Sequence, residues 1–274
     1  MKLNLWTKTT PLAGIYLLAL TACNAETAVT TPTNAMTTPT NAVTTPRIYT
    51  TGALLFAGSG TWSSEVAALE GILNDHSMTY RKVTSTQLDA MTSADLSDFG
   101  TFIFPGGNGS TEANSLSAAT HQRLRDSVQK VGVGYVGFCA GAFIGQAPAP
   151  SNGGDVSYGL GIVEGPTLDY YALENQGITE AMTLLTFTDG TTQNVLWYGG
   201  PVTPEQGVFA RYPDKTPAIS EIQSGMGRVV LVGGHPAATL TMLGALGLQA
   251  TSAEVQANQD LTWKLIQDAA GPSL

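Results

Sequence analysis

Three glycine-rich turns, each directly behind a short apolar run, restrict the fold of this chain more than any other feature of its sequence. The turns are Phe104-Pro105-Gly106-Gly107-Asn108-Gly109, Gly137-Phe138-Cys139-Ala140-Gly141 and Val232-Gly233-Gly234-His235-Pro236. A short apolar run that ends in turn residues is typical of a buried strand. In a parallel sheet, the turns behind the carboxyl ends of the strands meet at one edge and form sites there. We therefore expect these three turns to converge.

From Ile48 onward, short apolar runs alternate with longer amphipathic segments. This pattern predicts strands at 53–56, 101–104, 135–138, 183–188, 194–198 and 228–232. It predicts helices at 63–74, about 117–131, a short one from 140, and about 253–269. Strands that alternate with helices indicate an α/β fold with a mostly parallel sheet and helices on both faces. Residues 48–274 are expected to form this domain.

The first 22 residues read as a bacterial lipoprotein signal. Lys2 and Lys8 precede an apolar stretch, residues 12–20, that is too short to span a membrane. The small residues in Leu20-Thr21-Ala22-Cys23 resemble a lipoprotein cleavage box. Cleavage after residue 22 would leave a diacylglycerol on the sulfur of Cys23 and an acyl chain such as palmitate on the new amino terminus, which together make a stable membrane anchor. The alternative is an ordinary signal peptide in which Cys23 is incidental.

Residues 23–47 have the composition of a flexible tether between this anchor and the domain. They contain the tandem repeat VTTPTNA, MTTPTNA, VTTP, which has almost no charge and few bulky apolar residues. Such a segment buries too little surface to offset its ordering entropy. Asn24, rather than Asp, follows the cysteine. By resemblance to lipoprotein sorting rules, we expect the protein in the cell envelope, on the outer membrane and facing the periplasm.

The acidic charge of the chain restricts its partners. The formal net charge is −9, and removal of Lys2 and Lys8 with the signal lowers it to −11. An acidic surface argues against nucleic acid and anionic lipid as partners. No group of His, Asp and Glu has metal-ligand spacing, so we expect no metal and no other cofactor. Gly58-Ser59-Gly60-Thr61 lacks the Lys-Ser/Thr of a phosphate-binding loop and is interpreted as a plain turn.

Cys139 has the surroundings of a nucleophile on a sharp strand-to-helix turn. Gly137 and Gly141 stand two residues before and two after it, where a nucleophile elbow needs small residues because backbone approaches on both sides. A helix that begins near Ala140 would point its positive end at the sulfur and favour the thiolate. Three backbone amides are candidates to stabilise an oxyanion in acyl transfer: those of Gly106, Gly107 and Ala140. The alternative is a buried structural cysteine, since free cysteines are often buried.

His235 is the candidate base for this thiol. It follows a buried strand and two glycines, so it lies at a strand end as Cys139 does. The other two of the three histidines, His76 and His121, lie in polar helical surroundings and are interpreted as solvated surface side chains. A thiol nucleophile needs such a base to take and return its proton. The sequence therefore predicts a Cys139–His235 pair.

The motifs FPGGNGS, GYVGFCAGAF and GGHPA, in this order, resemble the class I glutamine amidotransferase-like superfamily. Within it, the likeness is strongest to the N-terminal domain of fungal-type biotin-protein ligases, which also occurs in stand-alone bacterial proteins. Trp197-Tyr198-Gly199-Gly200-Pro201 is similar to the Tyr-x-Gly-Gly-Pro segment of that family. The resemblance covers most of residues 50–247 and implies a flavodoxin-like fold, with Cys139 as nucleophile, His235 as base and Gly107 as oxyanion donor. No ligase catalytic domain follows, so biotin ligation by this chain alone is not implied.

One position departs from the pattern of many amidotransferases, which read His-Pro-Glu. Here Ala237 follows Pro236. Without the glutamate, the imidazole lacks the carboxylate that fixes its tautomer and stabilises its charged form. Three acids from elsewhere in the chain are candidates to replace it, and the spacing does not choose among them: Glu112, Glu164 and Asp169.

Two functions remain open. The first is an amidase-like hydrolase or transferase at the cell envelope, in which Cys139 attacks a small-molecule or peptide-like amide or related acyl bond and His235 shuttles the proton. The second is a catalytically silent binding module of the same fold, which the missing glutamate favours. No synthetase partner is implied, because a synthetase that consumes ammonia fits poorly outside the cytoplasm.

Overall fold

The computed structural model describes residues 48–146, 159–163, 165 and 169–271. The predicted signal and tether, residues 1–47, lie outside these ranges, and so does Glu164. Within the described residues, no helix combines the length and the apolar character needed to cross a membrane.

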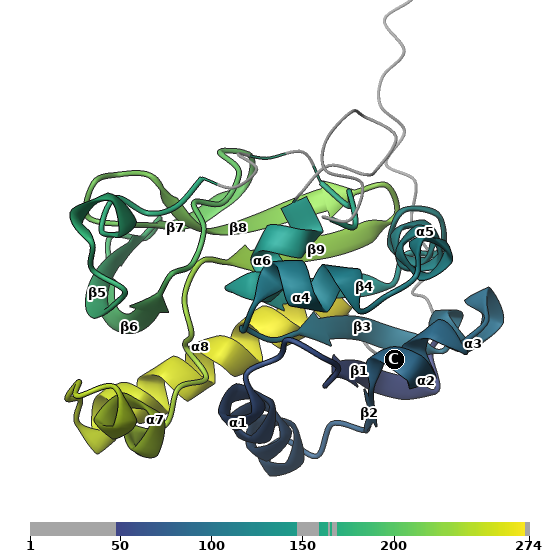
Figure 1. Ribbon diagram of the computed structural model, residues 1–274, viewed down its shortest axis with the longest axis horizontal. Helices are drawn as coiled ribbons and strands as arrows, with labels where there is room; N and C mark the ends of the chain where they lie inside the picture. Colours follow the sequence, from purple (N-terminus) through teal and green to yellow (C-terminus); the bar gives the residue numbers. More distant parts are fainter. Residues whose placement is uncertain (1–47, 147–158, 164, 166–168, 272–274) are drawn as a thin grey trace, which may run out of the picture. The chain divides into compact units, whose positions relative to one another are not determined.

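The described residues contain one nine-stranded sheet in the order β2-β1-β3-β4-β9-β8-β7-β5-β6 (Figure 1). The strands are β1 (Thr51–Phe56), β2 (Tyr80–Val83), β3 (Phe99–Phe104), β4 (Gly134–Phe138), β5 (Glu180–Phe187), β6 (Thr192–Tyr198), β7 (Val208–Arg211), β8 (Pro217–Ser224) and β9 (Gly227–Val232). The pairings from β2 to β9 are parallel. The pairings from β9 to β6 are antiparallel. The predicted parallel sheet is therefore confirmed, with an antiparallel extension.

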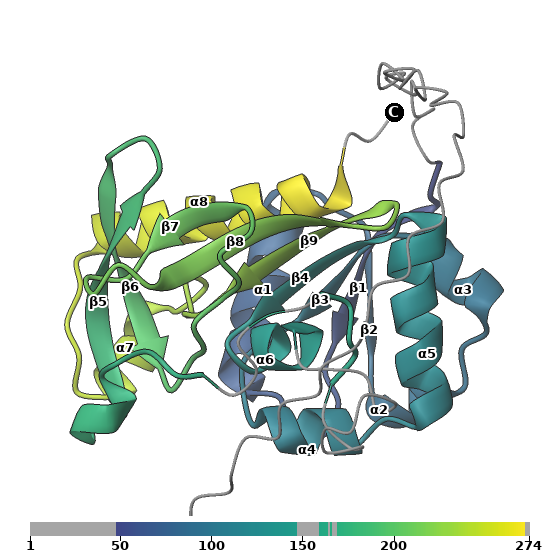
Figure 2. The same ribbon diagram turned by 90° about the horizontal axis from the view of Figure 1, so that it is seen from above.

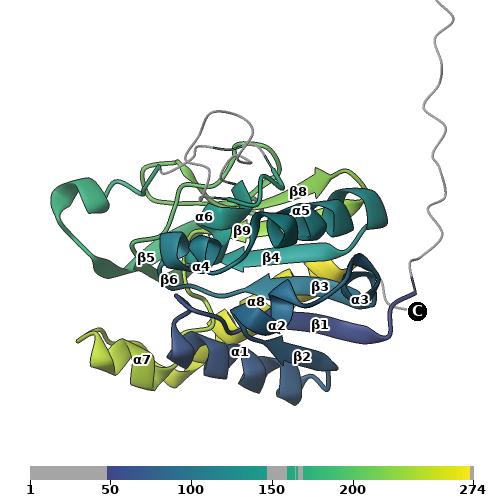
Figure 3. The same ribbon diagram turned by 45° about the vertical axis from the view of Figure 1, so that its right-hand side comes forward.

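Helices cover both faces of the parallel half, as predicted. They are α1 (Ser63–Asp75), α2 (Ser85–Asp89), α3 (Ser93–Ser97), α4 (Gly109–Asn114), α5 (Ala118–Asp126), α6 (Ala140–Gln146), α7 (Leu240–Ala245) and α8 (Ser252–Ala270). Figure 2 shows α8 on one side of the sheet and α4, α5 and α6 on the other. In Figure 3, α1 lies on the side opposite α4, α5 and α6.

The domain has two hydrophobic cores, one on each face of the sheet, because side chains alternate between the faces along each strand. Leu55 points into the cluster that contains α1 and α8. Its neighbours Leu54 and Phe56 point into the opposite cluster, with side chains of α2, α3 and α5. Because successive residues of a strand face opposite sides, a strand buried on both faces is apolar throughout. This explains the continuous apolar runs from which these strands were predicted.

Several elements were not predicted from the sequence. The strands β2, β7 and β8 and the short helices α2, α3, α4 and α7 were missed. The helix expected at about 117–131 is α5 followed by a π-helical turn, Ser127–Val131. The strands that lead into the three glycine-rich turns, β3, β4 and β9, agree with the prediction to within a few residues.

Candidate active site

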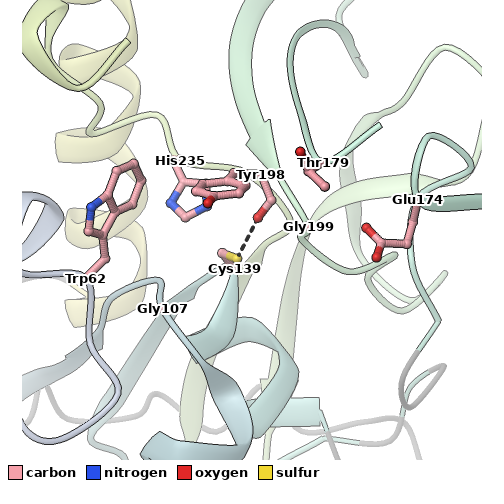
Figure 4. A pocket seen from close by; sticks show the side chains of 8 residues that line it. All are labelled: Trp62, Gly107, Cys139, Glu174, Thr179, Tyr198, Gly199 and His235. Carbon is pink, nitrogen blue, oxygen red and sulfur yellow. Dashed lines mark hydrogen bonds between the residues drawn. The ribbon is translucent and has the colours of Figure 1, made fainter. Parts of the chain in front are cut away.

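The three glycine-rich turns lie at one edge of the sheet because β3, β4 and β9 are adjacent. Phe104 of β3 is in register with Gly137 of β4, and Phe138 of β4 is in register with Val232 of β9. The turns thus leave the sheet from neighbouring positions. Their convergence, expected from the sequence, brings Gly107, Cys139 and His235 into the lining of one cavity (Figure 4).

The Cys139 turn has the backbone of a nucleophile elbow. Cys139 adopts φ +46°, a left-handed conformation that costs free energy for a residue with a side chain. A Cβ on Gly137 would lie 2.4 Å from the carbonyl carbon of Gly141, and a Cβ on Gly141 would lie 2.2 Å from the carbonyl oxygen of Phe104. The two glycines therefore permit close backbone contacts on both sides of the cysteine, as predicted.

The thiol of Cys139 borders a cavity of about 510 Å³. The residue is 4% exposed, and it is a free cysteine. Its Sγ donates a hydrogen bond to the carbonyl oxygen of Tyr198, at 3.4 Å. Tyr198 and Trp62 form part of the same lining. The sulfur is therefore almost covered, but it faces a space large enough for a small ligand.

His235 has a carboxylate partner, Glu65, that the sequence pattern did not indicate. Its Nδ1 lies 3.0 Å from Oε1 of Glu65, in the first turn of α1. The other oxygen of Glu65 accepts a hydrogen bond from the backbone N–H of Gly106, at 2.6 Å. His235 is 1% exposed and Glu65 is 0% exposed. Glu65 thus contacts His235 where the sequence analysis offered Glu112, Glu164 and Asp169.

The electrostatic surroundings of His235 favour its charged form. Burial lowers the pKa of His235, but the negative charges of Glu65 and Cys139 outweigh burial and raise this pKa well above its ordinary value. Nε2 has no hydrogen-bond partner among the described residues. The ring of Trp62 packs edge-on against the imidazole, with centroids 5.3 Å apart. The imidazole is therefore fixed by Glu65 at one nitrogen and free to react at the other.

The candidate oxyanion donors differ in their availability. The N–H of Gly106 already donates to Glu65, so its expected role is wrong for this structure. Gly107 lines the cavity with φ +155°, and a Cβ there would lie 2.0 Å from the carbonyl oxygen of Gly60. The amides of Gly107 and Ala140 donate to no acceptor within the described part of the chain. These two amides remain open to a ligand oxygen.

The acids proposed from the sequence lie elsewhere. Glu112 is fully buried, and its oxygens find no hydrogen-bond partner in the described ranges. Burial, and then the negative charges of Cys139 and Glu65, raise the pKa of Glu112 well above its ordinary value. Asp169 is exposed, and its backbone oxygen accepts a hydrogen bond from Val202. Glu164 lies outside the described residues.

The two remaining histidines are far from equivalent. His76 is exposed, and its ring stacks on Trp263 with centroids 4.2 Å apart. His121 is only 3% exposed, and its Nε2 lies 3.0 Å from the carbonyl oxygen of Ala113. Burial lowers the pKa of His121. The expectation of a solvated side chain is therefore wrong for His121, which is a core residue.

No group of three or more His, Cys, Asp or Glu side chains in the described ranges could hold a metal ion. The chemistry that the arrangement offers rests on the thiol, the imidazole and the backbone amides. These are the parts of a site for nucleophilic attack on a carbonyl carbon.

Comparisons with known proteins find a family model that is similar to part of the chain. Residues 51–173 match the family model described as biotin-protein ligase, N terminal. No curated protein matches the chain.

Three solved structures illustrate the likeness in three dimensions. An exo-β-1,4-mannosidase from Opitutaceae bacterium strain TAV5 has 12% identity and a TM-score of 0.41, with 81% of this chain and 36% of that chain covered. A β-galactosidase from Halorubrum lacusprofundi has 12% identity and a TM-score of 0.42, with 81% of this chain and 31% of that chain covered. Schizosaccharomyces pombe DJ-1 has 14% identity and a TM-score of 0.36, with 77% of this chain and 97% of that chain covered. The chain thus spans about a third of the two glycosidases and nearly all of DJ-1.

Proposed function

We propose that the described domain, whose residues 51–173 match the biotin-protein ligase N-terminal family model, is a class I glutamine amidotransferase-like protein that acts as a cysteine-dependent hydrolase or transferase on an amide or related acyl bond. One observation supports this most strongly. Cys139, at φ +46° on a strand-to-helix turn, shares a cavity with His235, whose Nδ1 is held by the buried Glu65. A strained nucleophile, a base and an acid that orients the base are the three parts of a catalytic triad.

The acylation step follows from these positions. The thiolate sulfur of Cys139 forms a bond to the carbonyl carbon, and the π electrons move to the carbonyl oxygen. The amides of Gly107 and Ala140 stabilise the resulting oxyanion. The carbon–nitrogen bond then breaks, and the amine leaves with the proton that Nε2 of the His235 imidazolium donates. A thioester on Cys139 and a neutral imidazole remain.

Deacylation runs through the same groups. The neutral imidazole takes a proton from water, whose oxygen attacks the thioester carbon. The carbon–sulfur bond breaks, and the acid product leaves while Cys139 returns to the thiolate and His235 to the imidazolium. If an alcohol or amine replaces water, the product is an ester or amide and the reaction is a transfer. Glu65 keeps Nδ1 protonated throughout, so only Nε2 exchanges protons.

An activated ester tests this function without knowledge of the natural substrate. With p-nitrophenyl acetate, the full chain carrying Cys23→Ser should release one equivalent of p-nitrophenolate in a rapid burst, and acid quenching should trap one acetyl group on Cys139. Mass spectrometry of the peptide that contains Cys139 checks this. Cys139→Ala should abolish both the burst and the acetyl group. A folded parent protein that forms no acetyl-Cys139 would refute the proposal.

A second candidate function is a catalytically silent binding module. It is favoured by the hydrogen bond that Sγ of Cys139 donates to the carbonyl oxygen of Tyr198, while Nε2 of His235 has no partner in the described residues. In a silent module, this hydrogen bond would persist and the cavity would bind a ligand without covalent reaction. The acetylation experiment separates the two functions.

We further propose that the protein is a lipoprotein of the cell envelope, anchored through Cys23. The cleavage box Leu20-Thr21-Ala22-Cys23 and the repeat that follows it support this proposal. Cys23→Ser should remove the diacylglycerol and release most of the protein from the membrane fraction, because the proposed anchor is attached through the sulfur of Cys23. Fractionation and immunoblotting measure the loss. Thr21→Ser, which keeps a small residue in the box, is the control, and equal membrane retention of Cys23→Ser and parent would contradict the anchor.

A further inference from the structure

We propose that the cavity of Cys139 selects amide substrates that carry a cationic group, an ammonium or a guanidinium, several bonds from the reacting carbonyl. This inference rests on the proposed function and names its substrate class. It follows from the distribution of charge around the cavity. The residue that would select the cationic group is Glu174, in the short 3₁₀ helix Glu174–Gln176.

The lining of the cavity has two unlike sides. Figure 4 shows Trp62 and His235 on one side of Cys139, and Thr179 and Glu174 on the other. The His235 side holds the reacting groups, since Nε2 must reach the leaving group. A substrate whose carbonyl lies at the sulfur therefore extends its remote part toward Glu174.

The carboxylate of Glu174 is not neutralised. Glu174 is exposed, and within the described residues its carboxylate has no hydrogen bond and no ion pair. No Lys or Arg is among the described residues that line the cavity. Thr179, on the same side of the cavity, donates its hydroxyl to the carboxylate of Glu180 and so offers no positive charge to Glu174. The remote end of the cavity therefore has an unmatched negative charge.

The charge of Glu174 also acts against anionic substrates. The rings of Trp62 and Tyr198 pack against His235, with centroids 5.3 and 6.3 Å from that of the imidazole, so they leave the carboxylate of Glu174 unmatched. A cationic tail that reaches Glu174 is attracted by this carboxylate. An anionic tail would instead meet Glu174 and lose its hydration. The positive charge of His235 lies at the carbonyl end, so it does not compensate an anion at the far end.

Methanethiosulfonates of different charge test this directly on the full chain carrying Cys23→Ser, in which Cys139 is the remaining cysteine. The thiolate sulfur attacks the divalent sulfur of the reagent and forms a disulfide with it, while the bond to the sulfonyl sulfur breaks and methanesulfinate leaves with the bonding electrons. The reagents are the 2-aminoethyl compound, which is cationic, the methyl compound, which is neutral, and the 2-sulfonatoethyl compound, which is anionic. The measured quantity is the ratio of each charged reagent's rate to the neutral reagent's rate, at low salt.

Glu174→Gln should lower the cationic-to-neutral ratio about two- to fivefold and raise the anionic-to-neutral ratio, as expected for loss of one partly exposed charge. Added salt should reduce the difference between parent and variant. Asp75→Asn is the matched control, since it removes one exposed charge at the last residue of α1. That position is about 18 Å along the helix from Ser63, the neighbour of Trp62 in the lining, so its charge acts on the cavity more weakly than a charge in the lining does.

The outcomes separate this inference from the function on which it rests. A fall of the cationic ratio in Glu174→Gln but not in Asp75→Asn supports the selection of cationic substrates. If Cys139 of the folded protein reacts with the neutral reagent but Glu174→Gln leaves both ratios unchanged, the inference is wrong and the proposed function stands. If even the neutral reagent modifies Cys139 only after unfolding, both are wrong.

Discussion

Replacing His235 by Asn is expected to slow the alkylation of Cys139 by iodoacetamide about tenfold or more near pH 6. The charges of Glu65 and Cys139 raise the pKa of His235 well above its ordinary value in spite of burial, so the imidazole is cationic at this pH. A cation beside the sulfur stabilises the thiolate, which is the reactive form. Asn has a similar size and no charge, so the variant loses this stabilisation.

The difference in alkylation rate between parent and His235→Asn should become smaller as the pH rises. Ordinary thiols ionise at about pH 8.5, so the rates of parent and His235→Asn should converge as the pH rises toward that value. The difference should be largest in mildly acidic solution. His76→Asn is the matched control, since His76 is exposed and stacks on Trp263. Equal rates for all three proteins across the pH range would count against a role of His235.

The second large effect is expected from Glu65. Glu65→Gln should lower the free energy of unfolding by about 3–5 kcal/mol, the cost of removing one partner from a buried ion pair. Glu65 accepts hydrogen bonds from both His235 and the backbone of Gly106. A glutamine has only one acceptor oxygen, so one of these buried donors must lose its partner. Urea denaturation followed by circular dichroism measures the change.

Glu70→Gln, on the same helix, is the control. Glu70 pairs with Lys82 at 2.8 Å, and both side chains are partly exposed, so its loss should cost less than about 1 kcal/mol.

The destabilisation caused by Glu65→Gln should depend on pH in a definite direction. The pKa of His235 is raised on folding, so the stabilisation from its charged form is complete below about pH 6.5 and is lost as the pH rises through the raised pKa. The free energy of unfolding lost in Glu65→Gln should therefore become smaller as the pH rises. If Glu65→Gln loses no more free energy of unfolding than Glu70→Gln does, the Glu65–His235 pair is not structurally important.

The sequence was sufficient to predict the parallel half of the sheet and the convergence of its turns. Strands buried on both faces are continuous apolar runs, and glycines mark where each one ends. The strands that were missed lack this pattern. The segment Tyr80–Val83 contains two charged residues, and Pro217–Ser224 begins with proline and contains a glutamate in its middle. These strands are held by pairing with neighbours, which a local pattern does not encode.

The partner of His235 could not be predicted for a different reason. Glu65 lies 170 residues before His235, in a helix turn that reads as amphipathic surface. Only the packing of α1 into the hydrophobic core on one face of the sheet brings its carboxylate to the imidazole. One signal was present, since the turn at Gly58-Ser59-Gly60-Thr61 also follows a strand of the parallel sheet. Acids just behind that turn could have been considered with the three that were named.

The reactivity of Cys139 in the folded protein is the most direct test of its proposed role as a nucleophile. In the full chain carrying Cys23→Ser, the rate of iodoacetamide labelling near pH 6 is measured before and after unfolding in urea, by mass spectrometry of the labelled peptide. A nucleophile beside a cationic His235 should label faster in the folded protein than in the unfolded protein, where the thiol is ordinary. Labelling only after unfolding, with no effect of His235→Asn, would contradict this role and identify Cys139 as a core residue of a silent binding module.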